Sequence, residues 1–238
     1  EDDFPTAAKD GGTDSIDNGG GNLRCYTDDT KATQIPIEVV SFVTGGTPSI
    51  QVWGLSPTLN VASTVYIEAD TVATTQPAVG AAFGRNATWV DYASVLHMSE
   101  TGTSGVFTDS TGNGNDTTKT SGGALNTTAT GHPFGGTWPD FTQDQALTLT
   151  TSAQMLNSSD YTLSHWISAD IVSGGDGAFG NRYSSNDTEW VQQNVSEKIS
   201  QKGSTSEDST AAVNYATSTT LIMHGAFDSS SLVSYKDG

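Results

Sequence analysis

The sequence predicts an all-β fold of two β-sandwich units. Gly, Ser and Thr are abundant, Lys is scarce, and long windows rich in helix-forming residues are missing. That composition is typical of a chain built from strands and turns. Short apolar runs also recur along the chain with turn-forming residues between them. At 238 residues the chain is long enough to bury a sizeable core, as one large or two small domains.

The first unit, residues 1–85, is predicted to be a small β-sandwich. Alternating or apolar runs predict strands at residues 23–27, 34–43, 49–55 and 64–69, with turns at 28–29 and 44–48. Residues 76–85 are interpreted as the linker. Cys25 is the only cysteine, so no intrachain disulfide can form. Its place in an alternating run favours a small buried strand residue over a nucleophile.

The stretch from Trp89 to Asp116 organises the second unit, residues 86–238. Residues 92–98 form an apolar run of strand length, which predicts the strand that opens this unit. Residues 109–116 follow as a dense cluster of Asp, Ser, Thr, Gly and Asn, which predicts a tight loop rich in oxygen atoms.

The rest of the second unit alternates between predicted strands and loops. Residues 99–140 are predicted to be long loops with one or two short strands, and 201–210 a polar loop. Strands are predicted at 144–150, 161–169, 190–199, 212–215, 219–227 and 232–235. At 190–199 the positions of Val191, Val195 and Ile199 also fit a helix, while the flanking Gly and Ser favour a strand.

Several short motifs occur in the order known from one protein family. They are the turn Asp109-Ser-Thr-Gly-Asn-Gly-Asn115, the run Tyr161-Thr-Leu-Ser-His-Trp-Ile167, and the pair Leu221-Ile-Met-His-Gly-Ala-Phe-Asp228 and Leu232-Val-Ser-Tyr-Lys-Asp-Gly238. Together they resemble a laminin-G-like, concanavalin A-like jelly-roll module. Residues 22–29, 35–40 and 50–53 resemble a domain of unknown function that often precedes it. The resemblance implies that residues 86–238 are a jelly roll lacking its last strands, which a neighbouring chain supplies or which a longer sequence contains.

The loop at residues 109–116 is the candidate metal site. Asp109, Asn113, Asn115 and Asp116 offer four side-chain oxygens within eight positions, and Ca²⁺ prefers such oxygen ligands. The resemblance implies calcium at an equivalent loop. The spacing is not that of an EF-hand, and a plain Asx-type turn is the alternative.

Aromatic side chains in polar, loop-like contexts are the candidate glycan ligands, since pyranose rings stack on exposed aromatics. These candidates, with their polar neighbours, are Trp138, Tyr183, Trp190, Asn181 and Asn186. Packing at the rim of the sandwich is the alternative for each aromatic. Three tryptophans within strand patterns are predicted to lie in the core: Trp53, Trp89 and Trp166. His165 is predicted to be a hydrogen-bonded core histidine.

Charge excludes several classes of partner. The chain has 27 acidic and 9 basic residues, a formal charge of -18 and a pI near 4.1. Such a surface repels nucleic acid and anionic lipid. No apolar run reaches the ~18 residues that span a bilayer. The acidic string of related glucanases, a nucleophile elbow and a P-loop are also missing from the sequence, which argues against an enzyme.

The predicted function is therefore non-enzymatic adhesion, glycan recognition or surface display at an extracellular location. The chain could decorate a virion or a cell-surface filament, with glycans or other subunits, including copies of itself, as partners. A glycan hydrolase or lyase of the same fold and a purely structural assembly subunit are the alternatives. Asn-x-Ser/Thr triplets, which matter only in a host that glycosylates them, begin at Asn86, Asn115, Asn126, Asn157, Asn186 and Asn194.

Overall fold

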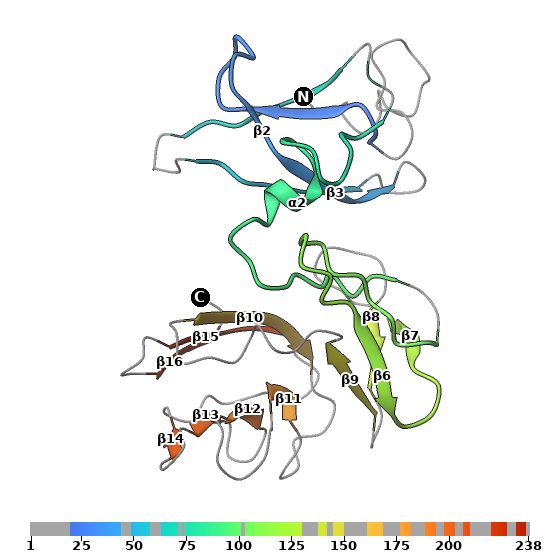
Figure 1. Cartoon of the computed structure of the whole chain (residues 1–238), viewed down its shortest axis with the longest axis vertical. Coiled ribbons are helices and arrows are strands. Elements are labelled where there is room, and N and C mark those ends of the chain that lie inside the picture. Colours follow the sequence, from blue (N-terminus) through green and yellow to red (C-terminus); the bar gives the residue numbers. More distant parts are fainter. Residues whose placement is uncertain are drawn as a thin grey trace. The chain divides into compact units, whose positions relative to one another are not determined.

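The computed structural model describes 143 of the 238 residues: 20–43, 49–57, 63–70, 73, 75–100, 103–129, 138–141, 145–149, 161–168, 177–181, 189–193, 198–202, 207–209, 220–227 and 232–236. The chain divides into two compact units, residues 1–152 and 153–238. Figure 1 shows the strands of the chain, coloured along the sequence from the first residue to the last. The domain boundary expected at residue 85 lies inside the first unit.

The described residues form an all-β arrangement. Every strand pair is antiparallel, and the one helix among these residues is the single turn α2 (Arg85–Thr88). Within this part of the chain no helix is long and apolar enough to cross a membrane.

Two sheets form the start of the first unit. In one, β1 (Leu23–Tyr26) lies between β2 (Gln34–Ile35) and β5 (Tyr66–Ala69). The other is the pair β3 (Ile37–Val43) and β4 (Ser49–Gly54). The single strand predicted over 34–43 is thus wrong. Pro36 has no N–H to continue the ladder, and the chain passes there from one sheet to the other.

The core of these strands is shared by both sheets. Leu23, Cys25, Ile35 and Ile37 are fully buried. Hydrophobic side chains from β3, β4 and β5 pack against them: Val39, Phe42, Ile50, Val52 and Ala69. The prediction of a buried Cys25 is confirmed, and burial raises the pKa of its thiol to about 11. Val65 and Ile67, which lie in the strand predicted at 64–69, are both exposed.

Residues 92–98 do not form the strand predicted to open the second unit. Their one ladder contact is an isolated bridge between Leu96 and Asp109. Met98 has a positive φ of 55°, outside the extended region. The N–H of Val95 and the carbonyls of Tyr92 and Ala93 bind side chains of the 109–116 loop, so these groups do not pair with a neighbouring strand.

Four short strands complete the described part of the first unit. β6 (Thr117–Ser121) pairs with β9 (Ala146–Leu149), and β7 (Asn126–Ala129) pairs with β8 (Trp138–Asp140). The strand predicted at 144–150 is confirmed as β9. The described residues between 99 and 140 form three strands, where one or two were expected.

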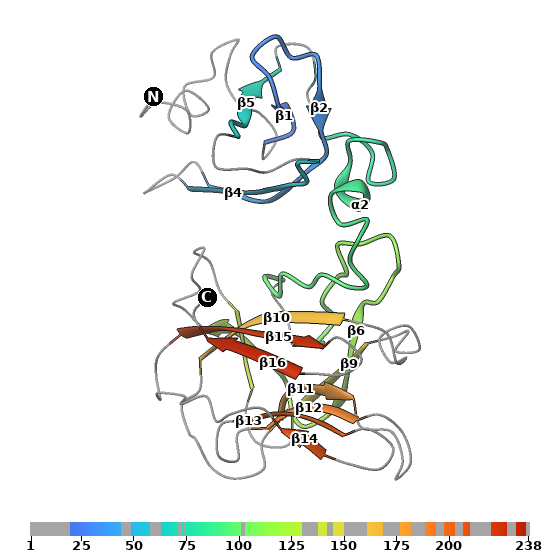
Figure 2. The same cartoon turned by 90° about the vertical axis from the view of Figure 1, so that its left-hand side faces the viewer.

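The second unit contains two described sheets. β15 (Thr220–Phe227) lies between β10 (Tyr161–Ser168) and β16 (Leu232–Lys236), as Figure 2 shows. The register of β10 and β15 runs unbroken from the Tyr161–Phe227 pair to the Ser168–Thr220 pair. The three strands predicted here from apolar runs are therefore confirmed. Trp166, predicted to lie in the core, is 38% exposed because β10 presents this side chain outward.

The other sheet has the order β11 (Gly177–Asn181), β12 (Glu189–Gln193), β13 (Lys198–Lys202) and β14 (Glu207–Ser209). The strand interpretation of residues 190–199 is confirmed over the helical one, although the chain forms two paired strands there. The polar loop predicted at 201–210 is wrong in part, because β13 and β14 pair through Ser200–Ser209 to Lys202–Glu207. The strand predicted at 212–215 lies outside the described residues.

Candidate functional site

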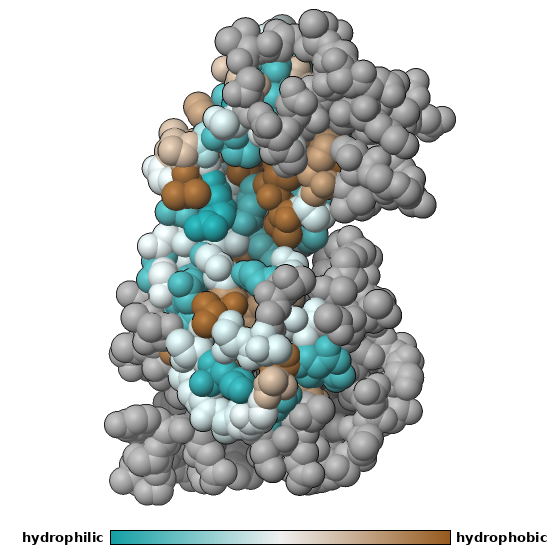
Figure 3. Space-filling model, turned by 90° about the vertical axis from the view of Figure 1, so that its right-hand side faces the viewer, coloured by the Kyte–Doolittle hydropathy of each residue, from teal (hydrophilic) through white to brown (hydrophobic). Residues whose placement is uncertain are grey.

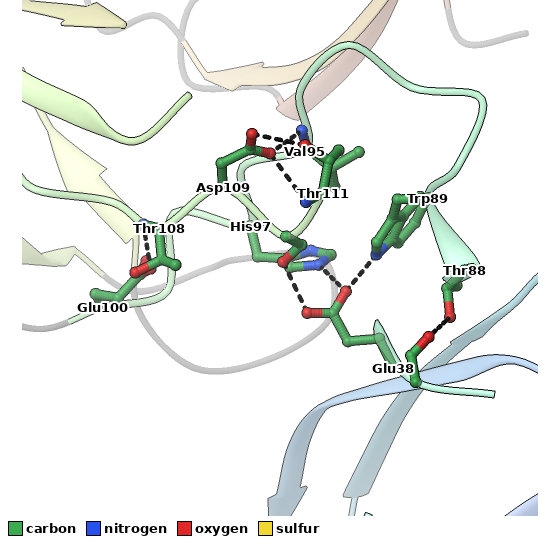
Figure 4. A network of polar contacts seen from close by, with 11 residues as sticks. Glu38, Thr88, Trp89, Val95, His97, Glu100, Thr108, Asp109 and Thr111 are labelled. Carbon is green, nitrogen blue, oxygen red and sulfur yellow. Dashed lines mark hydrogen bonds and ion pairs between the residues drawn. The ribbon is translucent and has the colours of Figure 1, made fainter. Parts of the chain in front are cut away.

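The loop at residues 109–116 is organised around the carboxylate of Asp109, which is 2% exposed. Its Oδ1 accepts hydrogen bonds from the N–H of Val95 at 2.9 Å and of Thr111 at 3.0 Å. Its Oδ2 accepts from Thr111 Oγ1 at 2.7 Å (Figure 4) and from the N–H of Asn115 at 2.9 Å. Burial alone would raise the pKa of Asp109, but these donors outweigh burial and lower the pKa from its usual value.

The other three predicted metal ligands join the same network. Asp116 Oδ1 accepts from the N–H of Asp109 at 2.8 Å. Asn113 Nδ2 donates to the carbonyls of Tyr92 and Ala93, and Asn115 Nδ2 donates to Ala93 O at 2.7 Å. The loop is therefore a built Asx-type turn that is fastened to residues 92–95.

The four predicted ligands are thus close together, but the oxygens of Asp109 already accept four hydrogen bonds from the chain. Within the described residues, no group of three or more His, Cys, Asp or Glu side chains could hold a metal ion. The donor set fits calcium through carboxylate and amide oxygens, and a calcium ion at this loop stays a prediction.

A second polar cluster, which the sequence did not predict, surrounds Glu38 on β3. Glu38 is 8% exposed. Trp89 Nε1 donates to Glu38 Oε2 at 2.5 Å, and His97 Nε2 lies 2.8 Å from the same oxygen. Ser110 Oγ donates to Oε1 at 2.7 Å. Figure 4 shows the carboxylate pointing between the indole and the imidazole. These four residues are named the Glu38 cluster below.

Aromatic rings cover the Glu38 cluster. The ring centroids of Trp53 and Trp89 lie 5.6 Å apart and tilted, and the ring of Trp53 stacks on His97 at 6.2 Å. The Trp89 ring also meets Tyr92 edge-on at 5.3 Å. Trp89 is buried, as predicted, and Trp53 on β4 is half-buried. The rings exclude water from the carboxylate, which strengthens its hydrogen bonds.

Two opposing effects set the charge of Glu38. Burial raises its pKa, whereas hydrogen bonds from His97, Ser110 and Trp89 and the charge of His97 lower it, and the lowering effects prevail. Glu38 is thus ionised at neutral pH and acts as an acceptor for all three partners.

The geometry of the Glu38 cluster suits a structural link between two segments of the chain better than nucleophilic catalysis. Ser110 donates to the carboxylate and not to His97, so the imidazole does not activate the hydroxyl as a general base would. Ser110 is buried as well. What the cluster does is join β3 to the segment from Trp89 to Ser110.

One sequence signal could have located this cluster. Glu38 is the single charged residue in the run from Ile35 to Val43, and a lone carboxylate in an apolar strand needs buried partners. Its partners lie 51, 59 and 72 positions away, so their identity could not be inferred from spacing.

The predicted glycan ligands are placed only in part. Trp138 is half-buried on β8, where Asn126 Nδ2 donates to Asp140 Oδ2 at 3.3 Å. Asn181 on β11 and Trp190 on β12 are direct cross-strand partners. Tyr183 and Asn186 lie outside the described residues. His165 on β10 is half-buried.

No protein-family model, curated protein or solved structure matches this chain. The laminin-G-like resemblance therefore stays a prediction.

Proposed function

We propose that the chain is a non-enzymatic extracellular module for adhesion, glycan recognition or surface display, with a laminin-G-like jelly roll as its second sandwich. The observation that carries this proposal is that the polar groups of the Glu38 cluster are bonded within the fold. A carboxylate, an imidazole and a hydroxyl converge there, yet Glu38 and Ser110 are buried, and the imidazole of His97 and the hydroxyl of Ser110 are both bonded to the carboxylate. Groups used in this way hold a scaffold together and present no reactive atom to a substrate.

Glycan recognition by this module would depend on aromatic side chains at the predicted ligand positions. Asn181 and Trp190 are register partners on the neighbouring strands β11 and β12, so these two predicted ligand positions lie side by side along the backbone. Such contacts are individually weak, and display of many copies on a virion or a filament raises the avidity without a stronger single site.

A glycan array combined with a reducing-sugar assay tests this function. Binding without release of reducing ends is the expected result, and the variant Trp190→Ala should lose most of the signal. Thr162→Ala, an exposed change on β10 in the same unit, is the matched control. Release of reducing ends by the wild type would support a hydrolase, and unsaturated products a lyase of this fold.

A purely structural assembly subunit is the second candidate, and one observation favours it. Large hydrophobic side chains are exposed at several places, including Val65, Val90 and Phe141. Exposed apolar groups of this kind often mark contacts with other subunits. Failure to bind any glycan, together with assembly into larger particles, would select this function.

Calcium at the 109–116 loop is tested by thermal unfolding with and without a chelator. If the ion binds the folded state, chelation lowers the melting temperature, and added Ca²⁺ restores it. An unchanged midpoint would remove calcium from the proposal. Asn113→Ala serves as the variant, because Asn113 is exposed and carries one of the predicted ligand oxygens.

A further inference from the structure

Exposed apolar side chains concentrate on one short stretch, residues 79–92, which includes α2. Val79, Phe83, Val90 and Tyr92 are all exposed, and Val90 reaches 67%. The stretch is compact: the N–H of Asn86 donates to Val79 O at 2.9 Å, and the N–H of Gly84 donates to Ala81 O at 3.0 Å. On the face shown in Figure 3, hydrophobic residues reach the surface among polar ones. Exposed apolar groups gathered in this way mark a contact surface.

Charge distinguishes this stretch from the rest of the chain. The molecule has a formal charge of -18, yet between Asp70 and Glu100 the charged side chains other than histidine are Arg85 and Asp91, which cancel. Two copies of so acidic a protein repel each other over most of their surfaces. A neutral, apolar stretch is where two copies can approach with the least repulsion.

Arg85 and Asp91 also lack partners that an interface could supply. Neither forms an ion pair with another described residue. Asp91 is exposed.

We propose that Val79, Phe83, Arg85, Val90, Asp91 and Tyr92 form a self-complementary contact between two copies of this chain, named here the connector surface. In a twofold dimer the same patch meets itself, so Arg85 of each copy faces Asp91 of the other, giving two equivalent ion pairs. The four apolar side chains pack between these pairs and supply most of the binding free energy. The connector surface does not depend on glycan binding, because a chain that binds no sugar can still dimerise through it.

Sedimentation velocity on the full chain tests the connector surface. In about 0.5 M salt, which screens the general repulsion, the wild type should sediment with twice the 24.8 kDa mass of one chain. Val90→Asp and Asp91→Arg should each weaken dimerisation about tenfold or more. Val65→Asp, an equally simple change at an exposed valine outside the stretch, is the control and should leave the dimer intact.

The charge swap Arg85→Asp with Asp91→Arg should recover dimerisation relative to Asp91→Arg alone, because the two ion pairs re-form with reversed sign. A wild type that sediments as one chain overturns the proposal. A dimer that both Val90→Asp and Asp91→Arg leave intact overturns it as well, since association then uses another surface. These two single changes lie at exposed positions and decide the question even if the swapped variant does not fold.

Discussion

One carboxylate, that of Glu38, accepts hydrogen bonds from donors in three distant parts of the sequence. Each donor is buried or nearly so, and each would be left without its acceptor if the carboxylate were removed. Glu38 therefore contributes to the free energy of unfolding mainly because its removal leaves buried donors without an acceptor, and less through the strength of any one hydrogen bond.

Replacing Glu38 with alanine should lower the free energy of unfolding by about 3 kcal/mol, because it removes a buried acceptor and leaves Trp89 Nε1 and Ser110 Oγ unpaired. Urea unfolding followed by tryptophan fluorescence measures this. Glu38→Gln, which keeps an acceptor oxygen and the side-chain shape, should cost roughly 1 kcal/mol. Equal losses in the two variants would show that the carboxylate bonds are not the source of the effect.

The same residue predicts a dependence of stability on pH. The pKa of Glu38 in the folded protein is held below its ordinary value of 4.5, so the unfolded chain takes up the proton first as the pH falls. Its contribution is complete above about pH 5 and is lost as the pH falls through the folded-state pKa. Melting temperatures between pH 7 and pH 3 should decline more steeply for the wild type than for Glu38→Gln. Parallel curves would contradict this.

At the scale of single loops and strands, Gly114 is the residue of the 109–116 loop that adopts a left-handed backbone conformation. Its φ is +71°, and nothing lies within 4 Å of the position of an added Cβ. Gly114→Ala should therefore cost about 1 kcal/mol through backbone strain alone. Gly123 has equal space and no positive φ, so Gly123→Ala is the matched control and should be neutral. Chemical denaturation of both variants gives the comparison.

The strands could be predicted where their pattern is local. The apolar runs at 161–168 and 220–227 are confirmed because a sheet buries alternate or continuous apolar residues wherever it forms. Residues 92–98 have the same apolar character and are not a strand. The carbonyls of Tyr92 and Ala93 bind the amides of Asn113 and Asn115, and such side-chain competition depends on a loop about twenty residues away.

The candidate site, like the strands, could be predicted where it depends on neighbouring residues and not where it depends on distant ones. The turn at residues 109–116 could be recognised from its composition, because Asp and Asn fold such turns with their own side chains. The partners of Glu38 could not, because they lie between 51 and 72 positions away from it along the chain. Likewise, Pro36 was visible in the sequence, yet its effect of sending β2 and β3 to different sheets is a property of the pairing.

At the scale of the whole molecule, the formal charge of -18 sets the response to salt. Mutual repulsion of acidic side chains opposes the folded state, and added ions screen it. Raising NaCl from about 0.1 M to about 1 M should therefore raise the melting temperature by several degrees. KCl at equal ionic strength should act equally, since screening does not depend on the cation. A fall in the midpoint would mean that attractive surface pairs outweigh the repulsion.

Asn115 begins an Asn-x-Thr triplet, yet its side chain is 0% exposed and its Nδ2 is bonded to Ala93 O. A sugar transferred to that nitrogen would have no room inside the closed turn and would remove a donor that the turn uses. In a secretory host that modifies such triplets, the yield of native protein therefore depends on the relative rates of folding and glycosylation, because the turn must close before the oligosaccharyltransferase reaches it.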